Sequence, residues 1–330
     1  MDHGPWTMNY GPWSMIFLTT LVNNQIQKIS FIGFLITISG AIFFSTKAIF
    51  VKMAFQDTKV DAVTLLSLRM LFSLPFYIGA AWIAHRKEGV AKLTKRQWLW
   101  VLIMGLFGYY LSSLFDFIGL QYVSAGLERL ILFLYPTFAV LINTFYFKTK
   151  LSRIQLLALI LTYIGIGTAY WGEIKSAHYG PQFFYGSFMI FLCAVTYSFY
   201  LVGTGRLVNA VGATRYTAYA MLAATAGIFI HFLMTQPISS VVMTTSLAGY
   251  GIALAIIATV LPSFMMSVGM KKIGSNNVAI ITSIGPVSTI LQAHFFLGES
   301  IILEQIVGTA LVIIGVLLIG WQSKIASEPS

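Results

Sequence analysis

The sequence predicts an all-α, polytopic membrane protein whose ten transmembrane helices form two inverted five-helix repeats. Hydrophobic residues make up 58% of the 330 residues and charged residues only 9%, whereas a soluble domain carries about 25% charged residues. Apolar stretches of about 20 residues, the length that crosses a bilayer, follow one another along most of the chain. Residues 113–165 also recur at 263–315 with a constant offset of 150 positions and no gap.

The first 27 residues differ from the rest of the chain. Their apolar run, residues 15–22, is too short to span a membrane and has no basic residue before it, which argues against a secretory signal. We expect a disordered or interfacial tail, or a true start of translation at Met15.

Ten apolar spans follow this tail. They must be helices, because an open strand edge leaves backbone groups unsatisfied in lipid. A β-barrel is excluded because the apolar runs are continuous rather than alternating. The predicted spans are 31–53, 62–84, 98–118, 124–147, 154–172, 183–204, 215–234, 247–269, 276–298 and 304–322.

The duplication extends to all five spans of each half. Within it, Pro136 corresponds to Pro286 and Gly165 to Gly315, and prolines and glycines have positional roles in helices that chance matches do not reproduce. Because five is an odd number, the second copy must enter the membrane upside down, as in many secondary transporters. The predicted parts are a cytoplasmic tail (1–28), two repeats (29–173 and 174–322) and a second cytoplasmic tail (323–330).

Lysine and arginine residues indicate the orientation. Most of them lie in alternate loops, such as residues 86–96 and 148–153, while the opposite loops carry only Lys59 and Lys175. By the positive-inside rule, both termini are expected in the cytoplasm, in an inner or plasma membrane. The net charge of +10 thus reflects membrane orientation, and we expect no nucleic-acid partner.

Charged side chains also occur inside or at the edges of the spans. A charge at the bilayer centre costs at least about 2.5 kcal/mol. Such residues usually face a bundle interior or a watery cavity. We therefore expect them to bind substrate in a central cavity between the halves. The candidates are Lys47, Arg69, Asp116, Glu128 and Arg129.

Other interpretations of these charges stay open. Asp116 and Glu128 lie close enough to a span end to be hydrated, while Lys47 and Arg69 could form structural ion pairs. Lys52 resembles an interfacial lysine whose head reaches the water. Glu128 and Arg129 are neighbours that point about 100° apart on a helix, so both cannot face one ligand squarely.

The second repeat lacks these charges. Met266 stands in place of Asp116, and Tyr200 in place of Lys47. The asymmetry suggests a site built mainly by the first half, with an apolar and aromatic wall from the second half, in which Tyr200 is the predicted substrate-binding residue. The other members of this wall are Tyr197, Tyr219 and Phe264, for which ordinary helix packing is the alternative.

Two prolines lie in the middle of equivalent spans, Pro136 in the fourth and Pro286 in the ninth. Proline removes a backbone hydrogen bond and bends a helix. We expect a matched pair of hinges, with static kinks as the alternative.

The second copy carries a recognisable pattern around its ninth and tenth spans. It reads Gly285-Pro286, then Gly298-Glu299, then Gln305-Ile-Val-Gly308 and Gly315. This pattern resembles the EamA branch of the drug/metabolite transporter superfamily, although the first copy has Thr149 in place of Glu299. The resemblance implies a secondary transporter of small metabolites, often an exporter, that works by alternating access.

A carrier is thus the leading hypothesis for function. The chain has no P-loop, zinc-protease or nucleophile-elbow motif that would indicate an enzyme. A channel would more naturally be a symmetric oligomer around a pore. Neither a cofactor nor a metal is expected, because Cys193 is the one cysteine and His231 and His294 lack a metal-ligand spacing.

The span charges Lys47, Arg69 and Arg129 outnumber Asp116 and Glu128 by one, which favours an organic anion or an amino-acid-like substrate. Lys47 and Arg69 would bind its negative group, and Asp116 or Glu128 an amine or a coupling proton. The expected partners are a small-molecule substrate, the lipid bilayer, and a coupling proton or exchanged solute. Importer or exchanger action and the oligomeric state stay open.

Overall fold

The computed structural model describes residues 31–86, 93–147, 153–176, 181–237, 242–273, 278 and 281–325. The predicted N-terminal tail (1–28) lies outside the described residues, as does the last part of the predicted C-terminal tail, 326–330. Every regular element in the described part is a helix, which agrees with the predicted all-α class.

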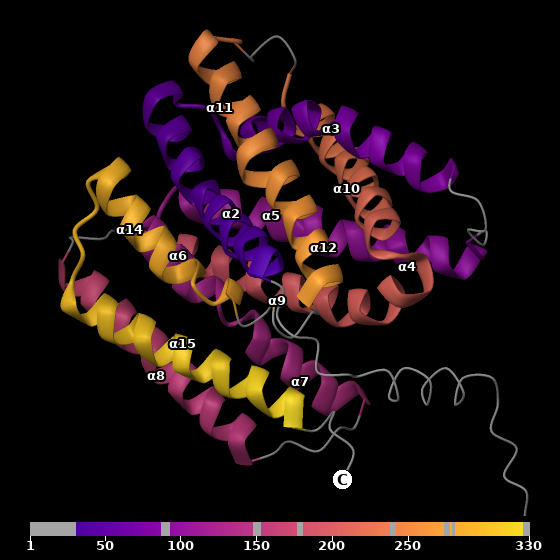
Figure 1. The fold of residues 1–330 in the computed structure, drawn as a ribbon. Helices are drawn as coiled ribbons and strands as arrows, with labels where there is room; N and C mark the ends of the chain where they lie inside the picture. Colours follow the sequence, from indigo (N-terminus) through magenta and orange to yellow (C-terminus); the bar gives the residue numbers. More distant parts are fainter. Residues whose placement is uncertain are drawn as a thin grey trace, which may run out of the picture.

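The helical elements follow the predicted spans closely (Figure 1). In chain order they are α2 (Phe31–Thr58), α3 (Ala62–Arg86), α4 (Lys95–Gly105), the π-helix η1 (Leu106–Leu111), α5 (Ser112–Leu120), α6 (Ala125–Leu132), α7 (Tyr135–Phe147), α8 (Arg153–Ser176), α9 (Pro181–Val211), α10 (Ala213–Thr235), α11 (Thr245–Ala255), the π-helix η3 (Ile256–Val260), α12 (Leu261–Ile273), α14 (Gly285–Leu297) and α15 (Leu303–Ile325).

By length and composition, eight helical stretches of the described residues are long and apolar enough to cross a membrane. They coincide with the first eight predicted spans. A shorter apolar helix, Leu303–Leu318, lies in the tenth, and α14 occupies the second part of the ninth. Several helices run past their predicted ends, most of all α9, which continues to Val211 instead of ending at residue 204.

The helix ends follow local sequence signals. Thr94 forms a capping box with Gln97 at the start of α4. Ser124 and Thr244 cap α6 and α11 through their side chains, which satisfies backbone N–H groups that have no partner within the helix. Gly298 ends α14 in the left-handed region at φ 68°, which glycine adopts without steric strain.

Two kinds of interruption occur at equivalent places in both halves. The π-helical segments η1 and η3 begin at Leu106 and Ile256, which are 150 positions apart. Turns at residues 133–134 and 283–284 separate α6 from α7 and precede α14.

The expected bends at the two prolines are therefore breaks between helical segments. Pro136 and Pro286 are the second residues of α7 and α14. A proline suits this position, because it has no N–H to satisfy and its φ is already helical.

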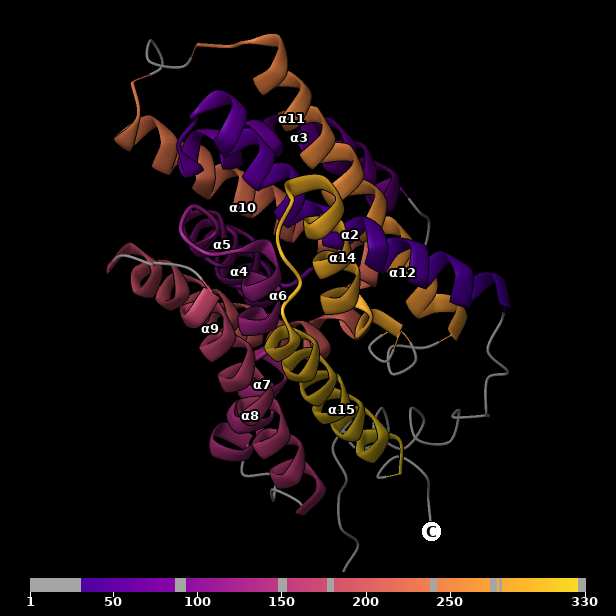
Figure 2. The ribbon, with the colours of Figure 1, turned by 90° about the vertical axis from the view of Figure 1, so that its left-hand side faces the viewer.

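The packing of the helices repeats in the same way. α2 lies against α11 and α12, as α9 lies against α4 and α5, and α2 contacts α14 as α9 contacts α7. Equivalent helices also pair with each other, α3 with α10 and α8 with α15, and α6 contacts α14 of the other half. Figures 1 and 2 show α7, α8 and α15 on one side of the molecule, with α2, α3, α10 and α11 on the other.

A close backbone approach joins α8 to α15. A methyl group on Gly165 would lie 2.6 Å from the Gly308 carbonyl oxygen, and one on Gly315 would lie 2.7 Å from the Ala158 carbonyl oxygen. These two contacts correspond to each other under the 150-position offset, so small residues allow the same approach twice.

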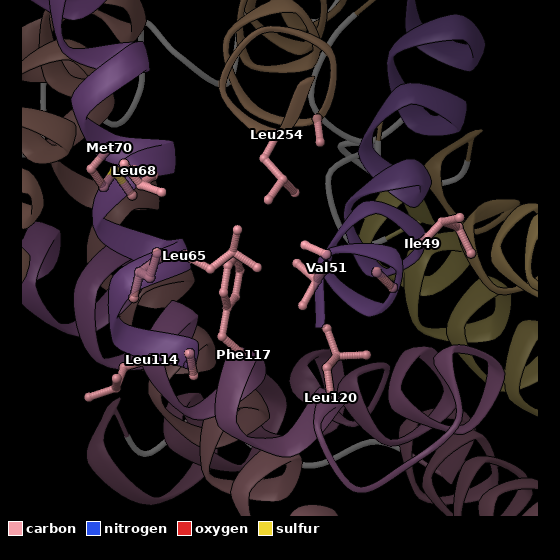
Figure 3. Packing of buried hydrophobic residues seen from close by; sticks show 14 of the residues in the cluster. Ile49, Val51, Leu65, Leu68, Met70, Leu114, Phe117, Leu120 and Leu254 are labelled. Atoms are coloured by element: carbon pink, nitrogen blue, oxygen red, sulfur yellow. The ribbon is translucent and has the colours of Figure 1, made fainter. Parts of the chain in front are cut away.

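The largest apolar core lies between α2, α3, α5 and α11. Figure 3 shows Val51 of α2, Leu65 of α3, Phe117 of α5 and Leu254 of α11 around one shared space. Phe117 follows Asp116 directly, so this core gives the predicted charged site an apolar surround.

Candidate functional site

Three helices of the first half bring one ammonium group and two carboxylates together. The Nζ atom of Lys47 (α2) lies 2.7 Å from Oδ2 of Asp116 (α5) and 3.5 Å from Oε1 of Glu128 (α6). Lys47 is 8% exposed, Asp116 1% and Glu128 0%. We refer to these three residues as the charge cluster.

Chain geometry explains why the two carboxylates meet. Asp116 precedes the end of α5 at Leu120, and Glu128 follows the start of α6 at Ala125. Residues 121–124 reverse the chain between them, so the two helices form a hairpin with both carboxylates near its closed end. Lys47 reaches this end from α2.

The cluster is electrostatically unbalanced. One ammonium faces two carboxylates, and Oδ1 of Asp116 and Oε2 of Glu128 have no hydrogen-bond partner among the described residues. A buried polar atom without a partner is unfavourable by about 1–3 kcal/mol. Such an arrangement is typical of a functional site, because a protein does not need it for stability.

Arg69 approaches the cluster from α3. Its Nη2 donates a hydrogen bond to Ser113 Oγ (2.9 Å), and its guanidinium lies 5.0 Å from the centre of the Phe117 ring. Ser113, Asp116 and Phe117 share one face of α5, as residues three and four apart do. Arg69, which is 4% exposed, therefore lies beside the cluster without an ion pair to a described residue within 4.0 Å.

Arg129 faces away from Glu128, as adjacent helical residues do. Its guanidinium lies 5.6 Å from the Phe133 ring centre, and a methyl group on Gly285 of α14 would lie 2.7 Å from its Nη2. Arg129 therefore reaches the start of α14 in the second half. The interpretation of Asp116 and Glu128 as hydrated surface residues is wrong, because the hairpin buries both.

Tyr200 does not contact the charge cluster. Its hydroxyl lies 2.8 Å from that of Tyr109, and its ring packs against Tyr109, Tyr197 and Tyr216. The ring also occupies the space next to Gly108 of η1, where any side chain would collide with it. Tyr200 thus belongs to a buried tyrosine group.

The other predicted wall residues divide between this group and ordinary packing. Tyr197 connects the tyrosine group to Tyr135 of α7, with ring centres 5.2 Å apart. Tyr219 packs on Trp98 and Phe264 on Tyr77, so packing is the role the structure gives these two. A direct contact between the second half and the cluster helices comes from Cys193, whose Sγ lies 3.2 Å from Ser112 Oγ.

Sequence reasoning missed a set of polar contacts around the hairpin. Ser124 donates a hydrogen bond to Glu173 of α8 (2.5 Å), and the carboxylate of Glu299 accepts N–H groups of Ala125 and Gly126. The sequence feature that could have identified Glu173 is its position, since it places a carboxylate at the end of the apolar fifth span. Lys52, expected at the interface, donates to the Val123 carbonyl oxygen (2.6 Å).

Two hollows of the described structure lie away from the cluster. A hollow of about 240 Å³ lies between α3 and α10, lined by Ser67 and Phe229 among others. Another, lined by Leu71 and Trp82, lies on α3. The side chains of the charge cluster are themselves buried in this conformation. No group of three or more histidine, cysteine or acidic side chains suited to a metal occurs among the described residues.

Long apolar helices around a buried, unbalanced charge cluster are typical of multi-pass membrane transport proteins. The chain belongs to the EamA-like transporter family, whose model matches it twice, at residues 31–171 and 184–321.

Two relatives and one solved structure agree with this assignment. The chain is 34% identical over 289 residues to the uncharacterized transporter YcbK of Bacillus subtilis, covering 84% of this chain and 88% of the relative. It is 20% identical to an uncharacterized transporter of Archaeoglobus fulgidus, covering 66% and 76%. A crystal structure with 19% identity superposes with a TM-score of 0.61 over 90% of this chain and 99% of the other, which shows a shared fold.

Proposed function

We propose that the protein is a secondary active transporter that exports a small metabolite across the inner or plasma membrane by alternating access. Ten spans in two inverted five-helix repeats, residues 29–173 and 174–322, form its framework. The single observation that carries this proposal is the charge cluster: Lys47, Asp116 and Glu128 are buried and unbalanced, as expected of a site that a charged ligand enters and leaves.

Equivalent features of the two halves support the inverted repeat. The π-helical segments, the two turns before α7 and α14, and the paired contacts of α8 with α15 all recur at the 150-position offset. The two matches of the family model support the same division. In such transporters, ligand sites lie near the repeat interface at broken helices, and Arg129 reaches such a break at Gly285.

The orientation with both termini in the cytoplasm follows from the lysine and arginine distribution. In this orientation, the loops near Asp61, Ser124 and Glu299 lie at the outer end. Contacts among these loops support their common side: Gln236 with Asp61 (3.5 Å), Ser124 with Glu173, and Glu299 with Ala125.

For the substrate, we propose an organic anion or an amino-acid-like solute. Lys47 is already paired with two carboxylates, so an incoming ligand must exchange partners with it. An amino-acid-like solute does this without leaving a charge unpaired. Its ammonium group replaces Lys47 at Asp116 and Glu128, while its carboxylate binds Lys47 and Arg69. Arg129 and the tyrosine group around Tyr200 would complete the wall.

Transport into vesicles tests this assignment. Purified protein in liposomes is tested for uptake and counterflow of labelled amino acids and organic acids, with saturation distinguishing a carrier from a channel. Replacing Lys47 or Arg69 by alanine should lower the rate about 10- to 100-fold, since a hydrogen bond to a charged group contributes about 1.5–3 kcal/mol.

Lys59→Ala is the matched control, because this lysine is exposed in the loop after α2. It should transport at the wild-type rate. Wild-type rates for both Lys47→Ala and Arg69→Ala, at equal amounts of folded protein, would contradict the assignment. In vesicles of known orientation, comparing uptake with counterflow also distinguishes export from the alternatives, import and exchange.

A further inference from the structure

The Gly298-Glu299 pair forms a contact outside the charge cluster. Gly298 turns the chain at the end of α14. The Glu299 side chain then lies over the N-terminus of α6, where its carboxylate oxygens accept the N–H groups of Ala125 (2.9 Å) and Gly126 (3.4 Å). A residue of the second half thus caps a helix of the first half.

Electrostatics make this contact stronger than a neutral hydrogen bond. The N-terminus of a helix carries partial positive charge from its free N–H groups, and a carboxylate that accepts such groups forms charge-assisted bonds. The same turn is held from the first half by Lys52 at the Val123 carbonyl and by Glu173 at Ser124. Glu299 therefore ties an already ordered turn to the second half.

Packing at this end is tight. A methyl group on Gly126 would collide with the side-chain amide of Gln305 in α15. One on Gly119 would lie 2.9 Å from the Gly186 carbonyl oxygen of α9. The α5–α6 hairpin therefore packs tightly against the second half at these two points.

The hairpin also carries two members of the charge cluster. Asp116 lies four residues before Leu120, and Glu128 two residues after Gly126. We infer that Glu299 is a positioning residue of the transport cycle, whose carboxylate holds the outer end of α6 against the second half and keeps the outer path to the cluster closed. This inference rests on the alternating access and the orientation proposed above.

Cys193 provides a reporter that needs no added residue. It is the only cysteine of the chain, it is buried, and its Sγ lies 3.2 Å from Ser112 Oγ, between α9 and α5. A membrane-impermeant maleimide, applied to intact cells or to inside-out vesicles, measures access to it from either side. Glu299→Ala should raise the outside rate about tenfold and lower the inside rate, because one population grows at the expense of the other.

Gly126→Ala tests the same contact with the carboxylate intact and should also raise outside labelling, since the added methyl pushes the hairpin from Gln305. The matched control is Gly167→Ala, where a methyl group meets nothing within 4 Å. This control should label like the wild type.

Outside labelling of Glu299→Ala and Gly126→Ala at the wild-type rate overturns the inference. Equal acceleration from both sides also overturns it, because that result indicates general loosening. Labelling requires no solute, so a failure of transport in vesicles leaves this test intact. One-sided labelling in a protein that moves no tested solute would support the role of Glu299 while contradicting the proposed substrate.

Discussion

Lys47 lies closer to Asp116 (2.7 Å) than to Glu128 (3.5 Å). The first pair is therefore the stronger ion pair, and Glu128 carries the excess negative charge of the cluster. A buried carboxylate whose charge is incompletely balanced is unfavourable, and taking up a proton relieves this cost. We therefore propose Glu128 as the residue at which a coupling proton would bind.

Replacing Glu128 by glutamine fixes this side chain in a neutral form of nearly the same shape. If Glu128 carries the coupling proton, the variant should lose most of the pH dependence of transport, and a pH gradient alone should no longer drive uptake. Transport in liposomes with and without an imposed gradient measures this, with Glu304→Gln as the control. An unchanged pH profile would remove Glu128 from the coupling role.

Residue-level features could be predicted from the sequence where they are unfavourable in lipid. Lys47, Asp116 and Glu128 were predicted because a charge in an apolar span needs a partner. Their pairing could not be predicted, since it depends on how three helices rotate against one another. The neighbours of Tyr200 could not be predicted for the same reason, because alignment with Lys47 places it in an equivalent span without fixing what it contacts.

At the scale of elements, small residues determine how closely two helices approach. Gly165 of α8 packs against the Gly308 carbonyl, whereas Gly167, two residues on, faces open space. These two glycines lie close together in the same helix. Comparing alanine substitutions at the two positions therefore separates the effect of packing from the effect of helix propensity.

Alanine at Gly165 should destabilise the protein by about 1–3 kcal/mol, because the added methyl group overpacks the contact with α15. Alanine at Gly167 should be neutral or stabilise by up to about 1 kcal/mol, because alanine favours the helix. Thermal unfolding in detergent, followed by tryptophan fluorescence, measures the difference in melting temperature. Equal melting temperatures for the two variants would show that α8 and α15 do not pack closely in solution.

The order and type of the elements could be predicted well, and their interruptions could not. Spans follow from long apolar runs, whose length matches the bilayer. The π-helical segments at Leu106 and Ile256 have no proline or other local signal within them, so only the packing of the folded protein reveals them. The prolines did mark the broken spans, but the breaks lie just before Pro136 and Pro286, where a proline starts a helix well.

At the scale of the molecule, we propose that contacts on both sides of the cluster close its two paths in this conformation. The α5–α6 hairpin and Glu299 close the outer end. The tyrosine group around Tyr200 and Gly108 lies towards the other end and closes the space between α9 and η1. Opening one end while the other stays closed is what alternating access requires, so the relative strength of these two contacts sets which state is populated.

External pH should act on the outer contact through Glu299, in the loop between α14 and α15. Burial against α6 raises the pKa of this carboxyl above its ordinary value of 4.5, although the N–H groups of Ala125 and Gly126 oppose the rise. The closed end therefore binds the proton more tightly than an open end where the carboxyl meets water. By linkage, protonation of Glu299 adds to closure below pH 4.5, because burial disfavours the ionised form, and this added contribution is lost as the pH rises through the raised pKa. The ionised carboxylate keeps its bonds to the N–H groups of Ala125 and Gly126. Outside labelling of Cys193, normalised to the reactivity of an unfolded sample at each pH, should increase as the pH rises from 4.5 through the raised pKa of Glu299. Glu299→Gln, which stays neutral, should flatten this profile, and a profile that persists in Glu299→Gln would assign the pH dependence to another group.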